Sequence, residues 1–148
     1  MRDRLRVLVL VLGVIVAACV GGSASPSPGG FQEVFEALAR RGATVTRIVS
    51  GDTGCADPTL VGNAVSFHLR LDDGVDREVH LFGFRDGAAL DAAEPRLDEC
   101  MRQFLAKKPS AEPPGAVGVG PFYAFASQWS ESAGDALGAA LGEAVGGS

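Results

Sequence analysis

Residues 64–71 alternate between apolar and polar side chains, and this alternation limits the fold more than any other feature of the sequence. Such a pattern is typical of a strand with one buried face. The turn residues Asp-Asp-Gly follow at 72–74, and 78–84 returns as the second strand of a hairpin. If Val79 and Leu81 share the face of Phe67, one expected register pairs Phe67 with Leu81.

Two further strands are predicted, separated from the hairpin by loops. Residues 43–50 are rich in β-branched side chains, and 122–127 in aromatic ones, which favours extended structure. Gly and Pro punctuate the segments 51–62 and 110–120, which are therefore predicted to be loops.

Three segments carry apolar residues at helical spacing. They are 31–41, 86–106 and 132–144, and Asp86 is a candidate N-cap for the second. Pro95 is expected to kink this helix or to begin a separate one, because proline removes a backbone donor.

The predicted order of elements is α-β-β-β-α-β-α. The fold class is α+β, with a mostly antiparallel four-stranded sheet and helices packed on one face. Residues 31–148 are long enough to bury a core of their own.

The N-terminus has the composition of an export signal. Arg2, Arg4 and Arg6 precede an uninterrupted apolar run of 12 residues, 7–18, and Cys19 follows at once. A run of this length fits a signal peptide better than a membrane span, which needs about 20 residues.

Residues 16–19 (Val-Ala-Ala-Cys) resemble the bacterial lipobox. This resemblance implies cleavage after residues 1–18 and attachment of a diacylglyceryl group to Cys19, with acyl chains such as palmitate. Residues 19–30 would then be a flexible Gly/Ser/Pro linker, and 31–148 an extracytoplasmic domain on the outer face of a membrane. Ordinary secretory cleavage near Ala18 and an uncleaved anchor remain alternatives.

The whole chain resembles small bacterial lipoproteins in its lipobox, its short linker and its small domain with two cysteines. This general likeness implies a place in the cell envelope and transfers no active site.

The charge of the chain argues against nucleic-acid binding. Its formal net charge is −5. Residues 1–18 carry three Arg and one Asp, so the remainder has a net charge of −7. No basic patch with interleaved aromatic residues is present to neutralise phosphates.

Cys55 and Cys100 are the two cysteines that remain once Cys19 is assigned to lipidation. In an oxidising compartment an even pair favours a disulfide. A reactive thiol is the alternative, although the sequence has no Cys-x-x-Cys motif and no histidine near either cysteine.

His68 and His80 are the two histidines. The expected hairpin register places them opposite each other, where both could reach one metal ion with a carboxylate such as Glu78 as third ligand. The competing interpretation is two unrelated polar residues on a solvent-exposed face.

Two other sets of residues are candidates for function. Asp52-Thr53-Gly54 matches the three-residue core of aspartic proteases, but these enzymes need two such carboxylates, so a tight turn beside Cys55 is expected. Tyr123 and Trp129 are candidates for a groove or partner surface, although most aromatic residues at this density belong to a core.

The leading functional hypothesis is a non-catalytic binding or interaction module, tethered to a membrane, with a possible envelope protein as partner and no cofactor. The alternative is a metal-binding protein or a small envelope hydrolase that uses His68, His80 and nearby carboxylates.

Overall fold

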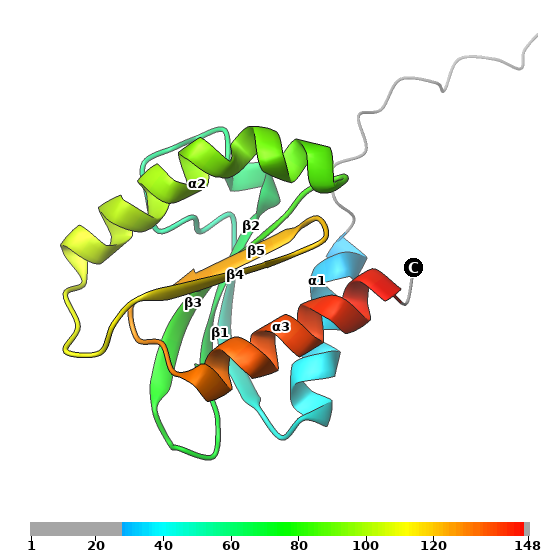
Figure 1. Cartoon of the computed structure of the whole chain (residues 1–148), viewed down its shortest axis with the longest axis vertical. Coiled ribbons are helices and arrows are strands. Elements are labelled where there is room, and N and C mark those ends of the chain that lie inside the picture. Colours follow the sequence, from blue (N-terminus) through cyan, green and yellow to red (C-terminus); the bar gives the residue numbers. More distant parts are fainter. Residues whose placement is uncertain (1–27, 147–148) are drawn as a thin grey trace, which may run out of the picture.

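The computed structural model describes residues 28–146, and the alternating segment forms an interior strand of its sheet (Figure 1). In chain order the elements are α1 (Pro28–Arg40), β1 (Thr44–Ser50), a 3₁₀ turn (Val61–Asn63), β2 (Ala64–Arg70), β3 (Asp76–Gly83), α2 (Gly87–Lys107), β4 (Gly115–Val119), β5 (Phe122–Ala126) and α3 (Glu131–Gly146). The α+β class is confirmed.

The sheet has five antiparallel strands in the order β1-β2-β3-β5-β4. The prediction of four strands was wrong because β4 lies in the segment 110–120, which was expected to be a loop. Two glycines in this short strand weaken its extended propensity. The two-residue turn Gly120-Pro121 then pairs β4 with β5, so the order of elements is α-β-β-β-α-β-β-α.

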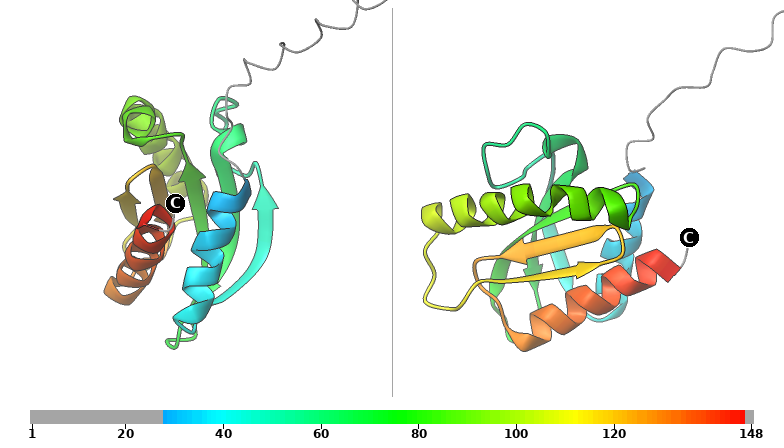
Figure 2. Two further views of the ribbon diagram at one scale, coloured as in Figure 1. Left: turned by 90° about the vertical axis from the view of Figure 1, so that its right-hand side faces the viewer. Right: turned by 45° about the horizontal axis from the view of Figure 1, so that its top comes forward.

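Helices cover both faces of the sheet, which corrects the prediction that they share one face. One buried cluster joins α1 and α3 to Phe67, Leu69 and Leu81. A second cluster joins α2 to Phe82 and Phe125 on the opposite face. Figure 2 shows β4 and β5 running between α2 and α3.

The helices begin and end close to the predicted residues. The helix α1 starts at Pro28, inside the predicted linker, because proline fits the first helical turn. It stops at Gly42, which takes a φ of 80°. Asp86 caps α2 by accepting a hydrogen bond from Ala89 N. The helix α2 continues through Pro95, so no separate second helix forms.

The β2–β3 register differs from the expected one by two residues. Phe67 pairs with Val79, and the loop is 71–75. Asp73 fixes this loop because its carboxylate accepts hydrogen bonds from Val75 N and from the buried Arg77 guanidinium. The predicted faces are retained, since Val79 and Leu81 remain on the core side with Phe67.

Candidate functional site

The predicted export signal lies outside the described residues. Cys19, where lipidation is predicted, and most of the predicted linker lie outside residues 28–146. Within the part of the chain that the structure describes, no helix combines the length and apolarity needed to cross a membrane.

Cys55 and Cys100 form a disulfide, as predicted. The bond connects the loop after β1 to the buried face of α2, because Cys100 is 1 % exposed. Such a bond is typical of proteins that fold in an oxidising compartment.

The two histidines do not meet. His68 pairs across the sheet with Glu78, and His80 pairs with Ser66, so the expected His68–His80 pair is wrong. The His68 imidazole lies near the surface, with Nδ1 3.2 Å from Asp76 Oδ2.

His80 is buried because α2 covers the sheet face that was expected to be exposed. Its ring has no solvent exposure and packs against Phe104 and Phe125, at centroid distances of 4.6 and 5.3 Å. Nδ1 lies 3.3 Å from the backbone oxygen of Asp52. Nε2 lies 3.3 Å from Glu78 Oε1, but it has no partner in hydrogen-bonding geometry among the described residues.

Asp52 lies beside this imidazole, in the Asp-Thr-Gly turn. Burial raises the pKa of Asp52, but hydrogen bonds from Ser66 Oγ (2.7 Å) and Gly54 N (3.1 Å) outweigh this effect and hold the pKa below its ordinary value. The carboxylate is therefore ionised at neutral pH. The Thr53 hydroxyl donates to the Cys55 carbonyl oxygen, which gives the tight turn that was expected here.

Glu78 and Lys108 complete the polar cluster. One carboxylate oxygen of Glu78 faces His80, and the other forms an ion pair with the Lys108 ammonium. This ammonium also lies 5.7 Å from the centre of the Phe104 ring. One potential ligand atom from each of Asp52, Glu78 and His80 lies within 4.8 Å of the others.

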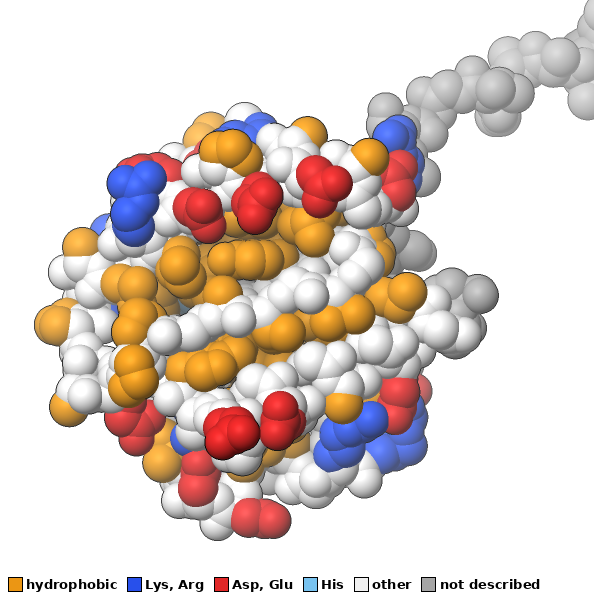
Figure 3. Space-filling view, in the orientation of Figure 1, with side chains coloured by type: hydrophobic (Ala, Val, Ile, Leu, Met, Phe, Trp, Pro, Cys, Tyr) orange, Lys and Arg blue, Asp and Glu red, His pale blue; other side chains and the backbone are white. Residues whose placement is uncertain are grey.

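A second candidate surface surrounds the outer edge of β4. β4 is the terminal strand, and no described strand pairs with its other side. In Figure 3 its backbone forms a pale strip between two apolar stripes, with acidic side chains along α2 and α3 beyond them. Val117 and Val119 of β4 and the predicted candidate Trp129 are partly buried against the first apolar cluster, whereas Met101, Leu105 and the predicted candidate Tyr123 are partly buried against the second.

The other sheet edge, β1, is protected. Its register shifts between Thr46 and Val49, and Arg47 takes a positive φ of 52° in this bulge. A bulge and a charged side chain are devices that keep an edge from pairing with another chain. β4, by contrast, has the sequence Gly-Ala-Val-Gly-Val, with no charge and no register shift.

The acidic rim beside β4 comes from two helices. Its members, all exposed, are Asp91, Glu94 and Asp98 on α2 and Glu131 and Asp135 on α3. Burial, followed by the negative charges of Asp98 and Glu94, raises the pKa of the Tyr123 hydroxyl. The rim therefore acts electrostatically on the apolar surface that it borders.

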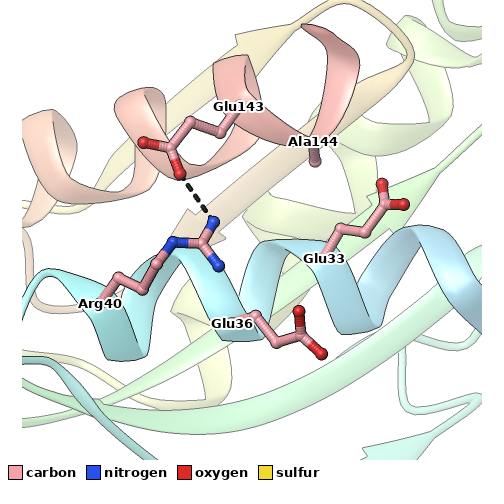
Figure 4. A pocket seen from close by; sticks show the side chains of 5 residues that line it. All are labelled: Glu33, Glu36, Arg40, Glu143 and Ala144. Carbon is pink, nitrogen blue, oxygen red and sulfur yellow. Dashed lines mark hydrogen bonds and ion pairs between the residues drawn. The ribbon is translucent and has the colours of Figure 1, made fainter. Parts of the chain in front are cut away.

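A third concave region lies between α1 and α3 (Figure 4). It is a groove of about 170 Å³ lined by Glu33, Glu36, Arg40, Glu143 and Ala144. Glu143 bridges the two helices by pairing with Arg40 and Arg41. We interpret these ion pairs as a structural link between α1 and α3, because each charged side chain that forms them is at least partly exposed to solvent.

Sequence reasoning named His80 and Glu78 together as possible metal ligands, but it considered Asp52 in a separate argument and missed its approach to the other two. The signal that could have revealed it is the apolar face of α2. This face must pack against the side of the sheet that α1 and α3 do not cover, and His80 lies on that side. Comparisons with known proteins found no matching family, no similar curated protein and no similar solved structure.

Proposed function

We propose that this protein is a membrane-anchored, non-catalytic envelope protein whose domain binds an extended segment of a partner protein along β4. The observation that carries the proposal is the contrast between the two sheet edges. β1 has a bulge and a charge that block pairing, whereas β4 has neither and lies between two apolar stripes.

The backbone of β4 offers suitable hydrogen-bonding groups. Val119 and Phe122 close the two-residue turn and therefore form a hydrogen-bonded pair with each other. Hydrogen-bonded and non-hydrogen-bonded residue pairs alternate along an antiparallel ladder. Ala116 and Gly118 are therefore in non-hydrogen-bonded pairs, and their N–H and C=O groups point away from β5, toward solvent. An added strand would use these groups for affinity and the two apolar stripes for side-chain specificity.

The negative charge around β4 indicates which kind of peptide segment would bind there. Acidic residues border both apolar stripes, and two arginines of α2 are engaged elsewhere: Arg96 with Thr59 and Arg102 with Glu99. We therefore expect a segment with β-branched or other apolar residues at its centre and Lys or Arg at its ends. A second copy of this chain would bring two acidic rims together, so charge repulsion disfavours it.

The test is selection of a random seven-residue peptide library against the full chain in detergent. We expect enriched peptides to carry apolar centres and net positive charge, and to bind more weakly at high salt. Ala116→Pro removes one outward N–H without breaking the β4–β5 ladder. It should weaken binding by about 5- to 100-fold, from a lost hydrogen bond of about 1 kcal/mol plus the unpaired carbonyl of the peptide.

Ala116→Ser is the matched control, because it changes the same side chain and keeps the N–H. It should bind the selected peptides as the unmodified protein does. Equal binding by folded Ala116→Pro, or enrichment of acidic peptides only, would refute strand addition at β4.

The membrane anchor is the second part of the proposal, supported by the charged start, the 12-residue apolar run and the Val-Ala-Ala-Cys junction. Cys19→Ala should lose both the lipid mass in intact-mass analysis and retention in the membrane fraction. The disulfide supports export but bears on lipidation only indirectly. A variant that stays fully in the membrane fraction would contradict lipid anchoring at this residue.

A further inference from the structure

Beneath the C-terminal end of α2, three potential metal ligands converge on a face of the sheet that is largely apolar. They come from two places in the fold: Asp52 from the loop after β1, and Glu78 and His80 from β3. His80 Nε2 is fully buried and has no hydrogen-bond partner among the described residues. A polar atom left in this state costs about 1–3 kcal/mol, so its position calls for a ligand.

The surrounding hydrogen bonds suit metal binding. In the neutral imidazole, Nδ1–H can donate to the Asp52 backbone oxygen, which leaves the lone pair on Nε2 facing the carboxylates. Metal-bound histidines commonly make this kind of second contact, and metal-bound carboxylates are themselves hydrogen-bonded. Asp52 satisfies the second condition through Ser66 Oγ and Gly54 N.

Gly54 keeps the space beside Nε2 free. A Cβ atom at this position would lie 3.0 Å from His80 Nε2 and 2.9 Å from Cε1. Its φ of 72° also favours glycine over any residue with a side chain. At Gly54, therefore, only backbone atoms of the turn approach the His80 imidazole.

We propose that Asp52, Glu78 and His80 bind one divalent transition-metal ion, with Zn²⁺ as the best match. One imidazole nitrogen and two carboxylate oxygens form a ligand set that zinc accepts, with a fourth position open to water. Softer ions favour thiolates, and Mg²⁺ or Ca²⁺ would favour oxygen ligands only.

Lys108 would compete with a metal ion for Glu78, because its ammonium pairs with the carboxylate oxygen that does not face His80. The Lys108 side chain is 52 % exposed, however, and can move into solvent. Tetrahedral zinc places its ligand atoms about 3.3–3.6 Å apart, from bonds of about 2.0–2.2 Å. The three ligand atoms, now within 4.8 Å of one another, would therefore draw together once the ammonium leaves.

Zinc titration of the full chain in detergent, followed by calorimetry, tests the assignment with the metal alone as the probe. We expect one strong site per chain. Loss of a ligand should weaken binding more than about 100-fold, since even changes outside the ligand set cost about 10- to 100-fold. Glu78→Gln is the first variant, because Glu78 is partly exposed and its loss should spare the fold, and His80→Gln is the second.

Lys108→Met should change zinc affinity in the opposite direction, and His68→Gln is the matched control. Removing the competing ammonium should strengthen zinc binding, whereas the surface histidine beside Asp76 should not matter. The proposal is overturned if the Lys108→Met protein shows no strong zinc site, if folded Glu78→Gln and His80→Gln bind zinc as tightly as the unmodified chain, or if His68→Gln abolishes binding.

Discussion

Trp129, the single tryptophan of the chain, packs into a slot between two glycines, and Gly115→Ala should expel it. A Cβ atom on Gly115 would lie 2.1 Å from Trp129 Cγ and 2.3 Å from Cδ2. These atoms are close to the root of the side chain, so a small rotation of the ring cannot relieve the overlap. Gly134 also contacts the ring, less tightly, since a Cβ atom there would lie 3.0 Å from Nε1.

The cost of expulsion follows from the apolar area that becomes exposed. A tryptophan buries about 150–250 Å² in a protein, and releasing roughly 100 Å² of it at about 25 cal/mol per Å² costs about 2.5 kcal/mol. For a domain of this size, we expect the melting temperature to fall by about 10 °C. The tryptophan fluorescence of the folded protein should also shift to longer wavelength as the indole enters water.

Gly118→Ala is the matched control on the same strand. Its Cβ atom would lie 3.6 Å from Tyr123 Cδ2, which is an ordinary contact. We expect it to be neutral or stabilising by up to about 1 kcal/mol, because alanine restricts the unfolded chain. If denaturant unfolding and fluorescence of Gly115→Ala match those of Gly118→Ala, the slot does not hold Trp129 as described.

Two further predictions concern stability. Reducing the Cys55–Cys100 disulfide, which spans 45 residues, should lower the free energy of unfolding by about 4 kcal/mol in the chain-entropy treatment, and a change below about 1 kcal/mol in denaturant titrations would contradict this. Hydrogen bonds from Arg41 and Arg40 lower the pKa of Glu143 from 4.5 to about 2. Its stabilisation is therefore complete above about pH 4.5 and lost as the pH falls to 2. The difference in melting temperature between Glu143→Gln and the unmodified protein should accordingly be present at pH 6 and absent near pH 2; a difference that stays constant would argue against the pairing.

Local patterns predicted the elements whose signals are strong. The alternation around Phe67 indicated the central hairpin, and the cap at Asp86 marked the start of α2. β4 was missed because its glycines carry no side chains from which a pattern could emerge. The hairpin register was missed because the Asp73–Arg77 contact, which shifts the loop, has no counterpart in hydrophobic spacing.

The candidate sites depended on tertiary packing. Spacing indicated that His80 and Glu78 lie near each other, but burial of His80 requires α2 on the second face, which no local pattern specifies. The approach of Asp52 likewise depends on the path of a loop held by Cys55. Cross-strand neighbours can be predicted from register, whereas contacts between layers cannot.

The unequal edges of the sheet also limit how copies of this domain could assemble. Growth into a fibre would need the β4 edge of one molecule to pair with the β1 edge of the next, repeated without closure. The bulge at Arg47 breaks the regular ladder on β1, so this head-to-tail pairing has no matching surface. Pairing of two copies through their β4 strands would cover both open edges, so assembly would stop at a dimer. If the chain is anchored to a membrane as proposed, even a high density at the surface would thus not lead to polymerisation, while one edge stays available to a partner.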